Sequence, residues 1–384
     1  MSSRNAEAIS GQALDFALNF LISMERSMDR RSFLKTAAAF SATSIAPFGV
    51  AAEAPWRTFE VTTRVELNTT GPASVWLPVP TVDTGYQKIL GSTFAADGAN
   101  ARIVHEARYG AGILLAEFPD HGKPVVELTS RFSTRDWAVD PTVAVSGARH
   151  DQAELQKYLE PTELLPIDGI VRQTALDITK GARTDLEKSR AIYEWIVDNT
   201  HRDAKVRGCG VGDIKSMLET QNLGGKCGDL NSLFVGLARS VGIPARDVYG
   251  IRVADSRLGY KSLGKSGDIT KAQHCRAEFH LAGVGWVPVD PADVRKVVLE
   301  ENGGLPLNDA KVEAARKRLF GSWEMNWLAL NYAHDVKLPN SAREPIGFFM
   351  YPNAEVVENR KIVRVDSLDP DNFTYRISSR EIIV

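Results

Sequence analysis

The first part of the chain with a clear pattern alternates apolar and polar positions. The stretch RTFEVTTRVEL carries an apolar or β-branched residue at every second position from Phe59 to Leu67, which predicts a strand with one buried face. Further short apolar runs, ASVWLPVP, GILLAEF and PVVELTSRFS, follow it and are separated by clusters of Gly, Asp and Pro. Several short strands at this spacing predict an all-β sandwich over residues 55–148.

After about residue 149 the apolar residues recur at helical spacing. The segments DQAELQKYLEPTELLP, DGIVRQTALDITKGA and DLEKSRAIYEWIVDNTHRD have this pattern, and IKSMLETQ adds a shorter helix. The strand-like runs RDVYGIRV, HCRAEFHL and GWVPVD come next. Helices followed by antiparallel strands predict an α+β core over residues 149–300. The remaining residues 301–384 contain a polar helix and more strand-like runs, so we expect a C-terminal strand extension that completes this core.

The first fifty residues are typical of an export signal. Arg30 and Arg31 precede Ser-Phe-Leu-Lys, a short apolar stretch and small residues around Ala51. This order resembles a twin-arginine signal over residues 1–52, with Met1, Met24 or Met28 as the start. The apolar stretch is too short and too rich in Ala and Ser for stable membrane insertion. We therefore expect the bacterial twin-arginine export machinery as a partner and a periplasmic or extracellular location.

Composition excludes several other classes of function. The chain has 46 basic and 48 acidic residues, a net charge of −2, so no strong field favours nucleic acid. Three cysteines in 384 residues do not make a disulfide scaffold. The sequence contains no H-E-x-x-H, C-x-x-C, EF-hand, Rossmann or P-loop pattern, and we assign no metal and no cofactor.

Cys227 occupies a position that favours thiol chemistry. The residues after it form a continuous apolar stripe for a buried helix that ends at Gly242 and Pro244. Cys227 therefore begins this helix, where the unpaired N–H groups and the positive end of the dipole favour a thiolate. The preceding Gly224 and Gly225 would let a substrate backbone approach the sulfur. The alternative is a small apolar residue at a helix start.

A nucleophilic thiolate needs a base, and the base needs a partner that orients it. His274 begins a strand that is joined to the strand ending at Asp290 by the turn AGVG. If the two strands pair about this turn, Asp290 comes to the His274 end, where its carboxylate would fix the imidazole tautomer. Each residue alone has an ordinary reading, His274 as an exposed strand residue and Asp290 as a turn residue before proline. The three residues together indicate catalysis.

The stretches GGKCGDLNSLFVGLARSVGIPAR and HCRAEFHLAGVGWVPVDPAD together resemble the transglutaminase-like superfamily of papain-type cysteine enzymes. The family pattern is G-x-C-x-D at the start of a buried helix that ends in R-x-x-G-I-P-A-R, then H-x-W-x-E and G-W-x-x-x-D-P. The resemblance covers about residues 150–300 and implies Cys227 as nucleophile, His274 as base and acid, and Asp290 as orienting group. Arg276 stands where the family usually has Trp, a difference that concerns the cleft wall.

The reaction implied is thiol-dependent acyl transfer on an amide or peptide bond through an acyl-enzyme. We expect hydrolysis, as in a cysteine peptidase or amidase, of a polypeptide or peptidoglycan-like substrate. An amine-dependent transglutaminase and a non-catalytic binding module for cell-wall or polypeptide ligands are the alternatives.

Three further residues remain candidates for supporting roles. Gln221, six residues before Cys227, is a candidate oxyanion donor, although it also ends a polar helix. Cys275 is expected on the strand face opposite His274, as a core thiol. Cys209 lies in a Gly-rich loop, and its pairing with Cys275 is left open.

Overall fold

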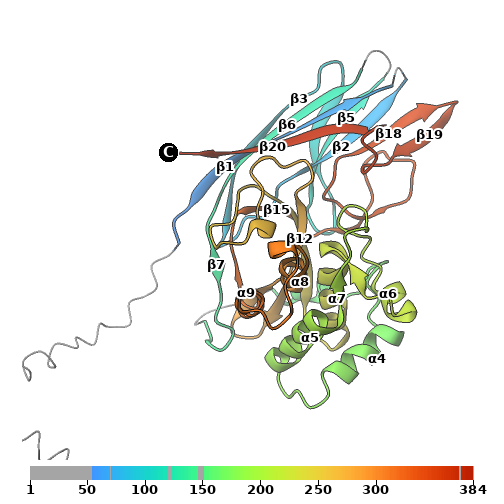
Figure 1. The fold of residues 1–384 in the computed structure, drawn as a ribbon. Helices are drawn as coiled ribbons and strands as arrows, with labels where there is room; N and C mark the ends of the chain where they lie inside the picture. The colour runs from blue at the N-terminus through green and yellow to red at the C-terminus, as the bar shows by residue number, and fades with distance from the viewer. Residues whose placement is uncertain (1–53, 70, 120–122, 146–150, 372, 384) are drawn as a thin grey trace, which may run out of the picture. The chain divides into compact units, whose positions relative to one another are not determined.

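The computed structural model describes residues 54–384, apart from residues 70, 120–122, 146–150, 372 and 384 (Figure 1). The predicted export signal therefore lies outside the described residues. Among the helices that the structure describes, none has the length and apolar character that a bilayer span requires.

Two five-stranded antiparallel sheets form the predicted sandwich. The first has the order β11-β20-β1-β6-β3 and the second β19-β18-β2-β5-β4. Apolar residues from both sheets, including Val65, Leu114 and Val126, pack into one buried cluster. The strands of the first sheet are β1 (Arg57–Leu67), β3 (Gln87–Ala95), β6 (Val125–Thr134), β11 (Gly267–Asp268) and β20 (Phe373–Ile382). The strands of the second are β2 (Ala73–Val79), β4 (Asn100–His105), β5 (Gly112–Phe118), β18 (Asn353–Glu358) and β19 (Lys361–Val365).

The C-terminal segment adds strands to this sandwich as well as to the predicted core. Strand β20 pairs with β1 along its whole length, from Thr58 opposite Ile382 to Leu67 opposite Phe373, and β18 pairs with β2. These strands pair there because β1 and β2 each leave an edge that must be hydrogen-bonded. Strand β15 (Trp327–Asn331) joins the sheet of the predicted core, and the helix Ala310–Arg318 adds Val312 and Ala315 to the buried cluster of that core.

The core is a four-stranded antiparallel sheet of order β13-β12-β10-β15 with helices against it. Its other strands are β10 (Ala245–Arg252), β12 (Gln273–Leu281) and β13 (Gly285–Val289). Helix α7 (Cys227–Ser240) is buried along its full length, and it packs on β10 and β12 among the helices that Figure 1 groups around it. These are α4 (Gly169–Ile178), α5 (Asp185–Asn199), α6 (Ile214–Thr220) and α8 (Pro291–Glu300). The α+β prediction with a sandwich before the core is confirmed.

Short elements connect these layers. Two of them, β8 (His201–Arg202) and β9 (Gly224–Gly225), pair in parallel and fix the chain just before Cys227. The others are α3 (Gln152–Lys157), α9 (Ala310–Arg318), η1 (Lys261–Leu263), η2 (Glu301–Gly303), β7 (Trp137–Ala138), β14 (Ser322–Trp323), β16 (His334–Val336) and β17 (Ile346–Phe348).

Candidate active site

Cys227 is the first residue of α7, as the sequence predicts, and its side chain is buried with 4% exposure. Asp229 holds this helix end in place, because its carboxylate accepts hydrogen bonds from the backbone N–H groups of Lys226, Val211 and Gly212, each at 2.9 Å. The Gly-rich loop that carries Cys209 is thereby tied to the start of α7. The first-turn N–H of Cys227 has no acceptor within its own helix, so it can donate to a substrate oxygen.

The two glycines before Cys227 serve packing. A Cβ at Gly224 would lie 2.5 Å from His201 Nε2, and a Cβ at Gly225 would lie 2.6 Å from the Asp229 Cβ. Both contacts are closer than real Cβ atoms approach their neighbours. Packing within the protein therefore requires glycine at both positions, in addition to the predicted approach of a substrate.

His274 and Asp290 are brought together by the pairing of β12 and β13. Ala277 lies opposite Val289, and from this register Asp290 reaches the His274 ring, with Nε2 and Oδ2 2.7 Å apart. Asp290 also begins α8 as its N-cap and accepts a hydrogen bond from the Asp293 N–H at 3.0 Å. The predicted proximity of the imidazole and the carboxylate is present, and both groups are buried.

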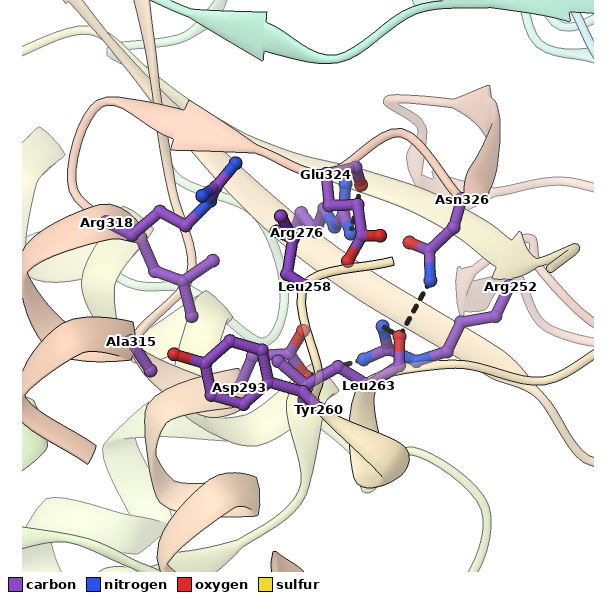
Figure 2. Close-up of a pocket in the computed structure, with 11 residues that line it drawn as sticks. Arg252, Leu258, Tyr260, Leu263, Arg276, Asp293, Ala315, Arg318, Glu324 and Asn326 are labelled. Carbon is purple, nitrogen blue, oxygen red and sulfur yellow. Dashed lines mark hydrogen bonds and ion pairs between the residues drawn. The ribbon is translucent and has the colours of Figure 1, made fainter. Parts of the chain in front are cut away.

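Asp293 and Arg252 belong to the same group and were missed from the sequence. Asp293 Oδ2 lies 3.4 Å from His274 Nε2, and its Oδ1 accepts a hydrogen bond from Arg252 at 2.6 Å. Figure 2 shows Arg252 and Asp293 in the wall of a small cavity. The available signal was the position of Asp293, three residues after the candidate Asp290 and close to it along the chain.

These charges set the protonation of His274. Burial and the Arg252 charge would lower the pKa of His274, but Asp293 and Asp290 outweigh them and raise it to about 9. Burial opposes ionisation of Asp293, yet Arg252 and His274 hold its pKa well below the usual range. Burial and the Asp293 charge raise the pKa of Asp290. The imidazole is therefore held as an imidazolium at neutral pH.

The pKa of the Cys227 thiol moves in the opposite direction. The neighbouring thiols of Cys209 and Cys275 lower the pKa of Cys227 well below its ordinary value, burial opposes them, and His274 lowers it further through a hydrogen bond and its charge. A thiolate beside an imidazolium is the reactive form of a papain-type nucleophile.

Arg276, which replaces the usual Trp, supports the carboxylate from behind. Its Nε lies 3.6 Å from Asp290 Oδ2, its Nη2 donates to the Glu324 carbonyl at 3.1 Å, and its guanidinium lies 4.6 Å from the Trp327 ring centroid. Burial lowers the pKa of Arg276 to about 10. Together with Glu324 it lines the small cavity in Figure 2, whose volume is about 20 Å³. Arg276 therefore faces the buried side of Asp290.

A cleft of about 1130 Å³ reaches Cys227 and His274 from solvent. Cys227 and His274 line it, together with Gln273, Tyr351 and residues of β20 such as Tyr375. The buried Gln273 Nε2 has no hydrogen-bond partner among the described residues, so this amide is a second candidate oxyanion donor. Gln273 directly precedes His274 in the sequence, and this position was a signal that the sequence analysis missed.

Gln221 lies elsewhere. It is an exposed residue at the C-terminal end of α6, in the left-handed conformation with φ of 55°, and it is not among the residues that line the cleft. Its expected role as oxyanion donor gains no geometric support.

The three cysteines converge although they are far apart in the sequence. All are free and buried, and the sulfurs of Cys209, Cys227 and Cys275 lie within 4.8 Å of one another. The expectation of Cys275 as a core thiol therefore described its burial but missed its proximity to Cys227.

Comparison with known proteins places this site in a family. Residues 172–291 match the family model of the transglutaminase-like superfamily, and this range includes Cys227, His274 and Asp290. An uncharacterized protein from Haemophilus influenzae is 37% identical over an alignment of 332 residues, and the match covers 81% of this chain and 87% of that protein.

The solved structures that resemble the chain are more distant in sequence. A proposed cysteine protease from Cytophaga hutchinsonii is 16% identical and covers 85% of this chain and 99% of its own, with a TM-score of 0.48. The periplasmic domain of TgpA from Pseudomonas aeruginosa is 15% identical and covers 68% and 92%, with a TM-score of 0.35. From the sequence match over the core and the motifs within it, the chain belongs to the transglutaminase-like superfamily.

Proposed function

We propose that this protein is a thiol-dependent acyl-transfer enzyme that hydrolyses an amide or peptide bond. The observation that carries the proposal is the meeting of three groups: a thiol at the start of a buried helix, and an imidazole held 2.7 Å from a buried carboxylate beside the same cleft. An imidazolium and a neighbouring low-pKa thiol are what covalent catalysis on an amide requires.

The reaction proceeds in two halves. The Cys227 thiolate attacks the amide carbonyl, and the oxyanion is stabilised by the Cys227 backbone N–H and the Gln273 amide. His274 gives its proton to the leaving amine as the C–N bond breaks, which leaves a thioester on Cys227. His274 then takes a proton from water, the hydroxyl attacks the thioester, and the thiolate and imidazolium are restored. Asp290 holds the ring in the required tautomer throughout.

Hydrolysis is favoured over amine transfer because the cleft is wide and open to water, and water is abundant. A primary amine in place of water would make the same acyl-enzyme a transglutaminase. A binding module without catalysis has no need for a buried imidazole and carboxylate beside a thiol.

The charge of the cleft favours a substrate that bears carboxylates. Eight of the lining residues are Lys or Arg and one is Asp268, although the whole chain has a net charge of −2. Several of these cations already have partners, such as Arg202, which lies 2.6 Å from Glu300. Lys226, Lys265 and Lys271 form no ion pair within the described residues, and they flank Cys227 and His274. Acidic peptides, including peptidoglycan-type stems with free carboxylates, fit this surface.

The proposed location is the bacterial periplasm or the extracellular space after twin-arginine export. It follows from the sequence of residues 1–52.

Mass spectrometry of an acyl adduct on Cys227 tests the function. The chain from residue 53 onward is incubated with acidic peptides and peptidoglycan fragments, with and without a primary amine, and quenched with acid. A substrate-dependent mass on Cys227, absent from a Cys227→Ala variant, is the expected result. No adduct and no product with either substrate class, in a protein whose Cys227 alkylates no faster than an ordinary thiol near pH 6, would contradict the proposal.

A further inference from the structure

A group of four buried sulfur atoms lies at the floor of the cleft. The sulfurs of Cys209, Cys227 and Cys275 form a triangle with no side longer than 4.8 Å. Met350 adds a thioether, with its Sδ 3.9 Å from the Cys275 sulfur. All four side chains are at most 5% exposed. Apart from Cys227, the proposed reaction gives none of these sulfurs a chemical step.

The distances suit one metal ion bound by three thiolates. Metal–sulfur bonds of about 2.3 Å, as in thiolate sites of d¹⁰ ions, place the sulfurs of a trigonal site about 4 Å apart. The triangle therefore needs to contract by less than about 1 Å. A disulfide would use only two of the sulfurs and leave the third thiol and the thioether without a role.

The donor set points to a soft ion. Thiolate and thioether ligands select Cu(I), whereas Mg²⁺ and Ca²⁺ require oxygen ligands. Zn²⁺ also binds thiolates, but it prefers four ligands from Cys, His and carboxylates, and thioethers are not among them. A three-sulfur site with a thioether at its edge therefore fits Cu(I) better.

The site is accessible from solvent at two of its corners. Cys209 and Cys227 line the cleft, and Cys275 lies beneath them with 0% exposure. The order of approach is thus the two cleft thiols first and Cys275 last. The Cys209 sulfur donates a hydrogen bond to the Gln273 carbonyl at 3.3 Å, a bond that it loses when it becomes a thiolate ligand.

We propose that Cys209, Cys227 and Cys275 form a binding site for Cu(I), with the Met350 thioether at its edge. Binding is a ligand exchange in which thiol protons are released to solvent and copper stays Cu(I). Because Cys227 is one of the ligands, an occupied site has no free nucleophile, and acyl transfer stops until the ion is removed. The inhibition rests on the proposed function, and the binding does not.

The experiment is an anaerobic competition titration of the folded chain with Cu(I) and a chromophoric Cu(I) chelator. X-ray absorption of the bound ion reports its ligands. We expect one ion per chain with three sulfurs at about 2.3 Å. Loss of a group that only orients a metal ligand weakens metal sites 10- to 100-fold. Loss of a ligand itself should cost at least as much, so Cys209→Ser and Cys275→Ala should each weaken Cu(I) binding by about 100-fold or more. Met350→Leu removes the thioether at the edge of the site. Met217→Leu, which replaces another buried methionine in α6, is its matched control.

The possible outcomes distinguish failure of the metal site, of the assigned ion and of the proposed function. Cu(I) affinity that is unchanged in both cysteine variants, whose folding is checked by circular dichroism, overturns the site. Binding of Zn²⁺ but not of Cu(I) overturns the assignment of the ion. A chain that binds Cu(I) through three sulfurs but shows no acyl transfer removes the proposed function and leaves the metal site in place. An active enzyme that does not bind Cu(I) removes only the metal site.

Discussion

Replacing Asp290 with Asn tests how far this one carboxylate raises the pKa of His274. The substitution removes the charge 2.7 Å from His274 Nε2 but keeps an oxygen that can accept the hydrogen bond. Asn is as good an N-cap as Asp, so α8 keeps its first turn. Arg276 loses a neighbour at 3.6 Å, which we expect to lower the free energy of unfolding by about 1–3 kcal/mol.

The size of the effect follows from the contact. A hydrogen bond to a charged group contributes about 1.5–3 kcal/mol, and one pKa unit corresponds to about 1.4 kcal/mol. The pKa of His274, about 9 in the native protein, should therefore fall by about 1–2 units. Asp293 at 3.4 Å retains part of the stabilisation. The same energy, lost from the transition state, lowers kcat/KM by about 10- to 100-fold.

The assay needs no substrate. The rate of Cys227 alkylation by iodoacetamide is followed by peptide mapping across pH, because the thiolate changes its reactivity when the imidazolium beside it loses its proton. The transition should move to lower pH in Asp290→Asn and stay in place in Asp309→Asn, which changes the N-cap of α9 away from the cleft. An unchanged transition in Asp290→Asn, with the variant folded, would refute the role of Asp290.

Three further predictions follow from the site. Activity of the native enzyme should decline above about pH 9, because His274 is needed as an acid and its pKa is raised to about 9; a profile that declines already near pH 6.5 would contradict this. Arg252→Met should lower the free energy of unfolding by about 3–5 kcal/mol in urea denaturation, because Asp293 would stay buried without its cation; a change under about 1 kcal/mol would speak against it. Lys271→Glu should raise KM for acidic peptides more than for neutral ones, with a difference that shrinks in high salt; equal effects on both would argue against carboxylate recognition.

The parts of the site that the sequence predicted are those set by local pattern. The helix start at Cys227 follows from the apolar stripe behind it, and the Asp290 position follows from the short turn between two strands. Arg252 and Cys209 were not predictable in the same way, because each meets the site through the tertiary arrangement of distant segments.

The fold also has features that local sequence pattern predicts and features that depend on tertiary arrangement. The alternation in residues 57–67 identifies β1 as a strand, but it contains no information about its partner, because every strand exposes hydrogen-bonding groups on two edges. Strand β3, with mostly exposed residues such as Leu90, gives no buried-face pattern to detect. The C-terminal strands were identified as strands, and their place could not be inferred from their own residues.

The pairing of β1 with β20 makes the cleft depend on two segments that are far apart in the sequence. About three hundred residues separate β1 from β20, and Tyr375 and Arg376 of β20 form part of the cleft wall. A nascent chain still held by the ribosome has no wall on that side, although Cys227 and His274 have long been made. A chain that is interrupted before β20 therefore lacks this part of the cleft wall, even when Cys227 and His274 are both present.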